Sequence, residues 1–234
     1  MKTIAIIIPA YNAEKYIREC LKSIHLQYPS EGWDYDIRVG VDGCKNTAKV
    51  LDKMNFPYYY SYNNVGAYVM RNSLMLIKPA DIYVYFDADD VMYSVKYIKI
   101  CIDAILQGHE IVMPSKYQCD ENLELLKSAP VFEQGGAMCF THRILDLLGG
   151  FYNARCASDT DFMHRAEMAG YKIYKIPQGL YMRRRHNQSL TKSGLTIHGG
   201  KYRKEVWQKM TADRENGIVK IIPRVTELEF KDVR

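Results

Sequence analysis

Short apolar runs alternate with amphipathic stretches along the first half of the chain. Runs rich in β-branched and aromatic residues are typical of buried strands, and apolar residues spaced three and four apart are typical of helices. Tyr16, Ile17, Cys20 and Ile24 have the helical spacing. The pattern predicts strands over residues 3–8, 35–41, 57–61, 82–86 and 111–113, and helices over residues 13–27, 45–53, 67–77 and 94–107.

This alternation predicts a mainly parallel sheet with helices on both faces, an α/β/α sandwich of the Rossmann-like kind. Ligands of such sheets bind beyond the carboxyl ends of the strands. Polar residues follow several of the predicted strands at that edge: Pro9, Tyr11 and Asn12; Asp42 and Gly43; and Asp87 to Asp90. We therefore expect a ligand site there. Asn12 is also a suitable N-cap for the first helix.

The pattern becomes less regular after residue 115. Residues 116–130 are expected to be irregular or weakly helical, residues 183–193 to form a basic loop, and the tail from Gly217 to be an edge strand or a flexible terminus. A helix capped by Thr141, further helices over 158–169 and 200–211, and a strand over 171–176 complete the prediction. Because no linker separates these parts, we expect one domain with halves 1–115 and 116–215, followed by a tail, 216–234.

The sequence FDADD at residues 86–90 ends the fourth predicted strand with three carboxylates. Carboxylates this close repel one another, and burial without a partner is costly. Hard oxygen ligands suit Mg²⁺ or Mn²⁺, so these residues are a candidate metal site. The alternative is an acidic start of the next helix, with Asp90 or Ser94 as its cap.

The composition is biased toward basic residues, but this bias does not identify the binding partner. The net charge is +5, and Arg183, Arg184, Arg185 and His186 are adjacent. This cluster suits an anionic substrate, a nucleic acid or an acidic membrane surface.

The six cysteines are scattered and form no C-x-x-C pair, which favours reduced thiols in a cytoplasmic protein. The apolar N-terminal run is too short for a signal peptide or a membrane span, so membrane association is expected to be peripheral at most.

Five motifs occur in one order: IIIPAYNAEKYIRECLKSI at 6–24, VDGCKNT at 41–47, NVGAYVMRN at 64–72, FDADD at 86–90 and GGFYNARCASDTDFMHRAEMAGYKI at 149–173. In this order they resemble a family 2 glycosyltransferase of the GT-A fold. The resemblance implies a nucleotide-diphosphate sugar donor, UDP-linked by preference, bound by residues 1–115. It implies that residues 116–215 bind the acceptor and carry the catalytic base.

The resemblance also implies roles for individual residues. Nucleotide binding is expected for Pro9, Tyr11, Asn12, Asp42, Arg71 and Asp87. Asp42 lacks the adjacent aspartate that is usual in the family, so the identity of the nucleotide base is less well defined. Metal binding, to Mn²⁺ or Mg²⁺, is expected for Asp89, Asp87 and His186, with FDADD as the D-x-D motif. Diphosphate or acceptor contacts are expected for Arg185, Lys192 and Gly136.

The resemblance implies that Asp159 is the base and that Asp161 is its catalytic neighbour, which orients the site or caps the helix. We therefore expect transfer of a sugar with inversion to an acceptor hydroxyl. The acceptor would be a cell-surface glycan, a lipid-linked saccharide or a polyanion such as modified DNA. Two alternatives stay open: a nucleotidyltransferase of similar fold, which PAYNAEKY at 9–16 disfavours because it lacks a Gly-rich basic loop, and a basic nucleic-acid-binding module.

Overall fold

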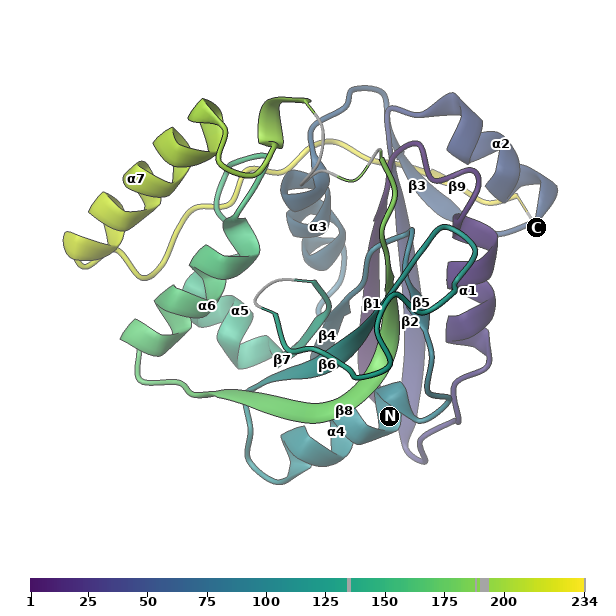
Figure 1. Cartoon of the computed structure of the whole chain (residues 1–234), viewed down its shortest axis with the longest axis horizontal. Helices are drawn as coiled ribbons and strands as arrows, with labels where there is room; N and C mark the ends of the chain where they lie inside the picture. Colours follow the sequence, from purple (N-terminus) through teal and green to yellow (C-terminus); the bar gives the residue numbers. More distant parts are fainter. Residues whose placement is uncertain (134–135, 188, 190–193, 234) are drawn as a thin grey trace.

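The computed structural model describes residues 1–133, 136–187, 189 and 194–233. Within them, a nine-stranded sheet has the order β5-β8-β6-β7-β4-β1-β2-β3-β9. Helices cover both faces of this sheet (Figure 1). The structure confirms the predicted α/β architecture of the Rossmann-like kind.

The first half forms the predicted parallel core. Strands β1 (Lys2–Ala10), β2 (Trp33–Asp42), β3 (Tyr58–Ser61) and β4 (Ile82–Tyr85) are parallel neighbours. Helices α1 (Ile17–His25), α2 (Lys45–Lys53), α3 (Ala67–Leu76) and α4 (Tyr97–Leu106) follow these strands in turn.

Alternation along β1 divides the core into two layers. Ile4, Ile6 and Ile8 pack with the buried faces of α1, α2 and α4, whereas Ala5 and Ile7 pack with α3, α5 and α6. Successive side chains of a strand point to opposite faces, so a continuous apolar run is required where both faces are covered. Figure 1 shows α1 and α2 on one side of the sheet and α3, α5 and α6 on the other.

The second half extends the sheet with strands of mixed direction. They are β5 (Val91–Met92), β6 (Ile111–Cys119), β7 (Met138–Thr141) and β8 (Ile173–Arg184). Strand β7 is antiparallel to both β4 and β6, whereas β8 is parallel to β6 and antiparallel to β5. The remaining helices are α5 (His142–Leu148), α6 (Ser158–Met168), the short 3₁₀ helix η1 (Gly194–Thr196) and α7 (Lys201–Glu215).

Three predictions for this half were wrong. Residues 116–119 belong to β6, although they were expected to be irregular. Strand β8 extends to Arg184, so two arginines of the expected basic loop lie in a strand. Helix α7 ends at Glu215 and not at residue 211. In the sheet the cause is pairing between β6 and β8, with register shifts after Pro114 and Ser115. Such pairing depends on the partner strand and leaves no periodic signal in either segment.

Thr141 is the N-cap residue of α5, as predicted, but the caps considered for α1 and α4 were wrong. Helix α1 begins at Ile17, and Asn12 instead lies in the preceding turn with a φ of 51°. Helix α4 begins at Tyr97 after Lys96, and neither Asp90 nor Ser94 caps it with its side chain. Asp90 instead accepts a hydrogen bond from Arg184 N.

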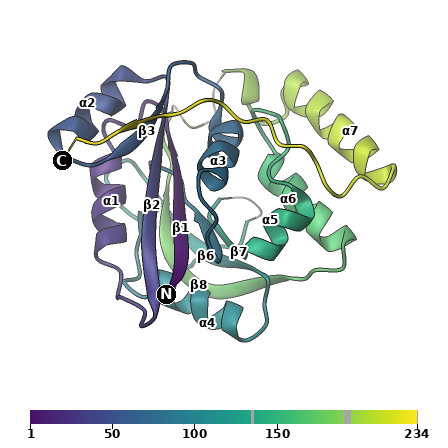
Figure 2. The ribbon, with the colours of Figure 1, turned by 180° about the vertical axis from the view of Figure 1, so that it is seen from behind.

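The tail returns to the first half of the sheet, which confirms the edge-strand alternative. Strand β9 (Glu229–Lys231) pairs antiparallel with β3. On the way, Ile221 N donates to Leu148 O at 3.1 Å and Thr226 N donates to Ser73 Oγ at 2.9 Å. Figure 2 shows this segment crossing α3 before it reaches β3.

All six cysteines are buried free thiols. Among the described residues, no helix combines the length and apolar character needed to cross a bilayer.

The close approach of the tail at Gly149 gives a stability test. Gly149 ends α5 with a φ of 77°, and a Cβ there would lie 2.0 Å from Ile221 O. We expect Gly149→Ala to lower the free energy of unfolding by about 3 kcal/mol, because backbone strain and displacement of the tail add. Urea denaturation measures this.

Gly170 is the matched control, since its φ is 86° and nothing lies within 4 Å of its added Cβ. Gly170→Ala should cost only about 1 kcal/mol from backbone strain. Equal losses for the two variants would contradict the contact between the tail and Gly149.

Candidate active site

Three carboxylates meet just beyond the carboxyl end of β4. Oxygens of Asp87, Asp89 and Asp90 all lie within 4.8 Å of one another. A turn holds them, since Asp90 N donates to Asp87 O at 3.2 Å, and Phe86 N continues the pairing with β1 by donating to Ile7 O. The apolar strand therefore ends abruptly and turns its acidic residues to the ligand-binding edge of the sheet.

Each carboxylate has a different partner. Asp87 forms an ion pair with Nη2 of Arg71, and Asp89 Oδ2 lies 2.8 Å from His186 Nε2. Asp90, which is only 2% exposed, accepts a hydrogen bond from Arg184 N at 2.9 Å. Burial and then the charges of Asp89 and Asp87 raise the pKa of the Asp90 carboxyl well above its usual range.

The donor set fits a hard divalent cation. Asp87 and Asp89 keep partly exposed side chains, 36% and 31%, so a ligand can reach their oxygens. A cation would relieve the mutual repulsion that, after burial, contributes to the raised pKa of Asp90. His186 is 8% exposed, and its Nδ1 is buried without a hydrogen bond in the described residues. In this geometry His186 orients Asp89, and it lies within reach of the same site.

Arg71 is the buried cation at the centre of the site. It is 3% exposed, and its guanidinium lies 4.4 Å from the ring centre of Tyr85 and 5.1 Å from that of Tyr68. Although burial lowers the pKa of Arg71, the attraction of Asp87 raises it overall. Aromatic faces stabilise such a cation where water is excluded. Its Nε is buried without a partner among the described residues.

Asp159, at the start of α6, reaches the same centre through α3. Tyr68 donates its hydroxyl proton to Asp159 Oδ1 at 3.0 Å, and Thr160 N donates to the same oxygen at 2.9 Å. Tyr68 and Arg71 are three residues apart on α3, so they share one face of that helix. One face of α3 therefore contacts Asp159 through Tyr68 and Asp87 through Arg71.

Asp161 has a different position. Its side chain is 1% exposed, it binds Arg165 Nε at 2.7 Å through Oδ2, and it pairs with Arg214 through Oδ1. Arg165 in turn donates to Leu148 O and Gly150 O at 2.8 and 2.7 Å. Both carboxylate oxygens are thus occupied in holding α6 to the end of α5 and to α7.

Tyr11, which follows β1, is 54% exposed, so its ring is free to contact a ligand. Pro9 is buried within β1, opposite Gly40 of β2. Asn12 Oδ1 accepts from Cys44 Sγ at 3.2 Å and joins the two loops.

Asp42 is only 2% exposed. Its two oxygens accept hydrogen bonds from Val65 N and Gly66 N at 2.7 and 2.8 Å, so it holds the loop before α3. Burial raises the pKa of Asp42 against the effect of these bonds.

The late basic segment is only partly described. Arg185 N donates to Cys119 O at 2.9 Å, and Lys192 lies outside the described residues. Gly136 has a φ of 92°, and a Cβ there would lie 2.5 Å from the Tyr181 hydroxyl. A larger residue at 136 would therefore displace Tyr181.

Sequence reasoning missed Lys116 and Glu133 at the edge of the site, and it placed Arg183 only in the basic cluster. Buried Lys116 and partly exposed Arg183 both pair with Glu133, at 3.3 and 3.4 Å. Attraction from Asp90 contributes to raising the pKa of Arg183, against the lowering by burial. Because Lys116 was assigned to an irregular segment, nothing in the sequence predicted that it would lie at the edge of the site. Tyr68 was also missed, although its three-residue spacing from Arg71 could have indicated that it faces the same site.

Comparison with known proteins agrees with this architecture. The sequence model described as Glycosyl transferase family 2 matches residues 5–169, more than half of the chain. The chain belongs to this family. No curated protein sequence matches the chain.

Solved structures resemble its fold. S. aureus TarS 1–349 in complex with UDP-GlcNAc aligns with a TM-score of 0.69 at 17% identity, over 92% of this chain and 67% of that chain. Mannosyltransferase PcManGT from Pyrobaculum calidifontis, in complex with GDP-Man and Mn²⁺, aligns with a TM-score of 0.63 at 17% identity, over 90% and 61%.

The chain spans only part of the length of these structures. It covers 60% of a second TarS 1–349 structure and 40% of a longer TarS chain.

The contrast between the two acidic residues of α6 gives a second test. We expect Asp161→Asn to lower the free energy of unfolding by about 4 kcal/mol, because Arg165 loses its buried counter-charge. Asp159→Asn should change stability by less than about 1 kcal/mol, since an amide oxygen still accepts the Tyr68 bond. Chemical denaturation compares them, and a larger loss for Asp159→Asn would refute these assignments.

Proposed function

We propose that this protein transfers a sugar from a metal-bound nucleotide-diphosphate sugar to an acceptor hydroxyl with inversion at the anomeric carbon. The observation that carries the proposal is the contact of one face of α3 with both functional groups. Tyr68 donates to Asp159, and Arg71 pairs with Asp87. The proposed general base and the carboxylates proposed to hold a metal-bound diphosphate would therefore lie on the same face of α3.

At the donor end, Asp89 and Asp87 would hold Mn²⁺ or Mg²⁺, with His186 orienting Asp89 or completing the set. When bound, the cation neutralises the negative charge that develops on the leaving diphosphate. Arg71 holds Asp87 in position through their ion pair. Arg185, Lys192 and Gly136 are proposed diphosphate or acceptor contacts.

Nucleotide selection would depend on the loops after β1 and β2. We propose that Tyr11 stacks on the base, which its 54% exposure supports. Pro9 and Asn12 are also proposed to contribute to nucleotide binding, since both lie within two residues of Tyr11. Asp42 holds the Val65–Gly66 loop that borders the base. We propose a UDP-linked sugar as the first donor to test and a GDP-linked sugar as the second, since solved relatives hold UDP-GlcNAc and GDP-Man.

At the acceptor end, Asp159 would take the proton of the attacking hydroxyl. Its Oδ1 already accepts from Tyr68 and Thr160, which fixes the carboxylate and leaves Oδ2 to receive the proton. Asp161 would act as a positioning residue that holds α6, because Arg165 and Arg214 occupy its oxygens. Residues 1–115 would then bind the donor and residues 116–215 the acceptor.

Replacing the proposed base tests the reaction. We expect Asp159→Asn to slow release of the nucleoside diphosphate by about 10²- to 10⁴-fold, the usual contribution of a general base. Turnover of UDP- and GDP-sugars with Mn²⁺, in the presence of carbohydrate acceptors, measures this. Nucleotide affinity should be unchanged, because Asp159 lies at the acceptor end.

Two results would contradict the proposal. Near wild-type turnover of Asp159→Asn would exclude it as the base. Release of pyrophosphate in place of a nucleoside diphosphate would favour the nucleotidyltransferase alternative.

Metal binding can be tested separately. At Mn²⁺ about 100-fold above its dissociation constant, the free energy of unfolding should rise by about 2.7 kcal/mol. The melting temperature should rise by roughly 5–10 °C. Asp89→Asn should lose most of this shift, since it removes a charged ligand.

Asp103→Asn is the control, because Asp103 is a 47% exposed acid on α4 that pairs with Lys99. It should keep the full shift. An undiminished Mn²⁺ shift in Asp89→Asn would refute its role as a ligand.

A further inference from the structure

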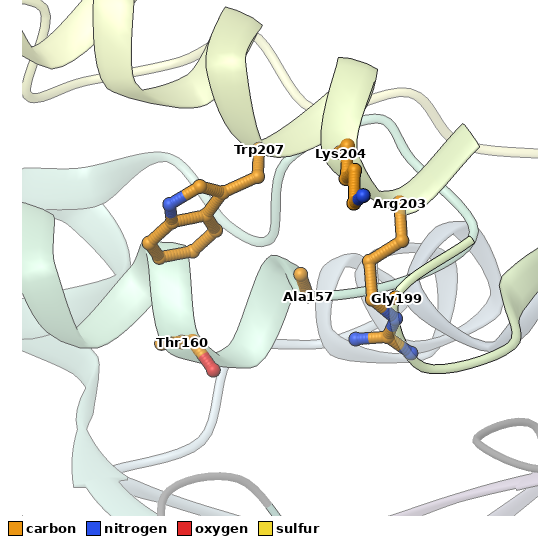
Figure 3. Close-up of a pocket in the computed structure, with 6 residues that line it drawn as sticks. All are labelled: Ala157, Thr160, Gly199, Arg203, Lys204 and Trp207. Atoms are coloured by element: carbon orange, nitrogen blue, oxygen red, sulfur yellow. The ribbon is translucent and has the colours of Figure 1, made fainter. Parts of the chain in front are cut away.

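A separate cleft of about 270 Å³ lies between α6 and α7. Its lining residues are Ala157, Thr160, Gly199, Arg203, Lys204 and Trp207. Figure 3 shows the indole ring of Trp207 and the guanidinium of Arg203 on opposite sides of Ala157. The cleft thus combines an aromatic ring with two cations. None of its lining residues in the described part of the chain is acidic.

Arg203 is fixed in this cleft. Its Nε and Nη2 donate to the carbonyl of Thr196, a 5% exposed residue of η1, at 3.1 and 2.9 Å. Because the guanidinium is planar, these bonds leave Nη1 and the outer Nη2 proton directed away from Thr196. A held guanidinium suits a carboxylate or phosphate oxygen, because little further ordering is needed. Lys204 is exposed and adds a mobile second charge.

Trp207 is held as well, since the His164 ring lies 5.8 Å away edge-on and the Arg214 guanidinium lies 5.0 Å from its ring centre. Arg214 also pairs with Asp161, so the ring is tied to the buried ion pairs of α6. An indole face borders sugar rings through their C–H groups while their hydroxyls stay solvated. The ring and the cations together match a saccharide that carries a negative charge.

The cleft adjoins the proposed base. Thr160 lines it and follows Asp159 directly, and Thr160 N donates to Asp159 Oδ1. Cys156 lies within electrostatic reach of both groups, since Arg203 lowers and Asp159 raises the pKa of its thiol, after the larger effect of burial. A sugar seated against Trp207 would therefore lie at the same end of α6 as the carboxylate proposed to receive its proton.

We propose that this cleft binds the acceptor and that the acceptor is an acidic saccharide, whose phosphate or carboxylate group meets Arg203 and Lys204. The inference rests on the proposed transfer to an acceptor hydroxyl, because it assigns the second substrate of that reaction. Both phosphorylated sugars and uronic acids have the required chemistry.

Fluorescence of Trp207 tests the proposal. Trp33 and Trp207 are the two tryptophans, so Trp33→Phe makes Trp207 the sole reporter. Glucose 6-phosphate, glucuronic acid and neutral glucose are titrated in turn. We expect at least one acidic sugar to bind about tenfold or more tightly than glucose, through its charged hydrogen bonds. The stronger of the two identifies phosphate or carboxylate as the recognised group.

Lys204→Glu should weaken acidic-sugar binding by about tenfold, since it reverses one of the two cleft charges. Lys209→Glu is the matched control, with the same charge change on the same exposed helix but outside the cleft. It should alter affinity by less than about twofold at moderate salt, where distant exposed charges are screened. For Trp207 itself, ligand-observed NMR should show binding retained in Trp207→Phe and lost in Trp207→Ala.

Three outcomes would overturn the proposal: equal binding of glucose and both acidic sugars, equal weakening by Lys204→Glu and Lys209→Glu, or a response of Trp207 to a single-stranded oligonucleotide but to neither acidic sugar. UDP with Mn²⁺ should still stabilise Lys204→Glu as it does the wild type. If that stabilisation occurs while no acidic sugar binds, the acceptor assignment fails and the glycosyl-transfer proposal stands. If UDP and Mn²⁺ fail to stabilise the wild type, the donor site fails independently.

Discussion

Repulsion among three carboxylates at the end of β4 is the constraint around which the site is organised. Asp87 is offset by a buried arginine, Asp89 by His186, and Asp90 by the backbone of β8. Each partner comes from a different element, so α3, β8 and the segment after it must converge for the acidic turn to be stable. The same convergence leaves Asp87 and Asp89 partly open on one side. At that open side, a bound cation would supply positive charge to these two carboxylates. A diphosphate would supply the negative charge that balances the cation.

A second set of buried charges holds the second half of the chain together. Asp161 pairs with Arg165 and Arg214, and Arg165 also satisfies carbonyls at the end of α5. Breaking such a network leaves a buried charge without a partner, which costs far more than the pair contributes. The network therefore fixes the start of α6, and with it Asp159. It also fixes α7, which supplies Trp207 and the two cations of the α6/α7 cleft.

These two charge networks meet across α3. Tyr68 contacts Asp159 and Arg71 contacts Asp87, while Phe151 packs against both Tyr68 and Tyr85. The tail reinforces this helix from outside, because Thr226 bonds to Ser73 before β9 pairs with β3. The acidic turn and Asp159 are thus held at a fixed separation by a helix whose residues are almost all buried. Transfer between two bound substrates requires such a fixed separation.

The sequence by itself determined the parallel core and its ligand-binding edge. The apolar runs of β1 and β4 and the helical spacing of α1 are local signals, and polar residues at strand ends mark the edge directly. Motif order indicated the family and directed attention to Asp87, Asp89, Arg71 and Asp159.

Only the tertiary structure decided how these residues are used. Contacts between distant segments determine the long β6–β8 pairing and the burial of Lys116. They also give Asp159 and Asp161 different partners and occupy both oxygens of Asp42. Partner strands and counter-charges come from distant parts of the chain, so the sequence of a single strand or helix does not predict them.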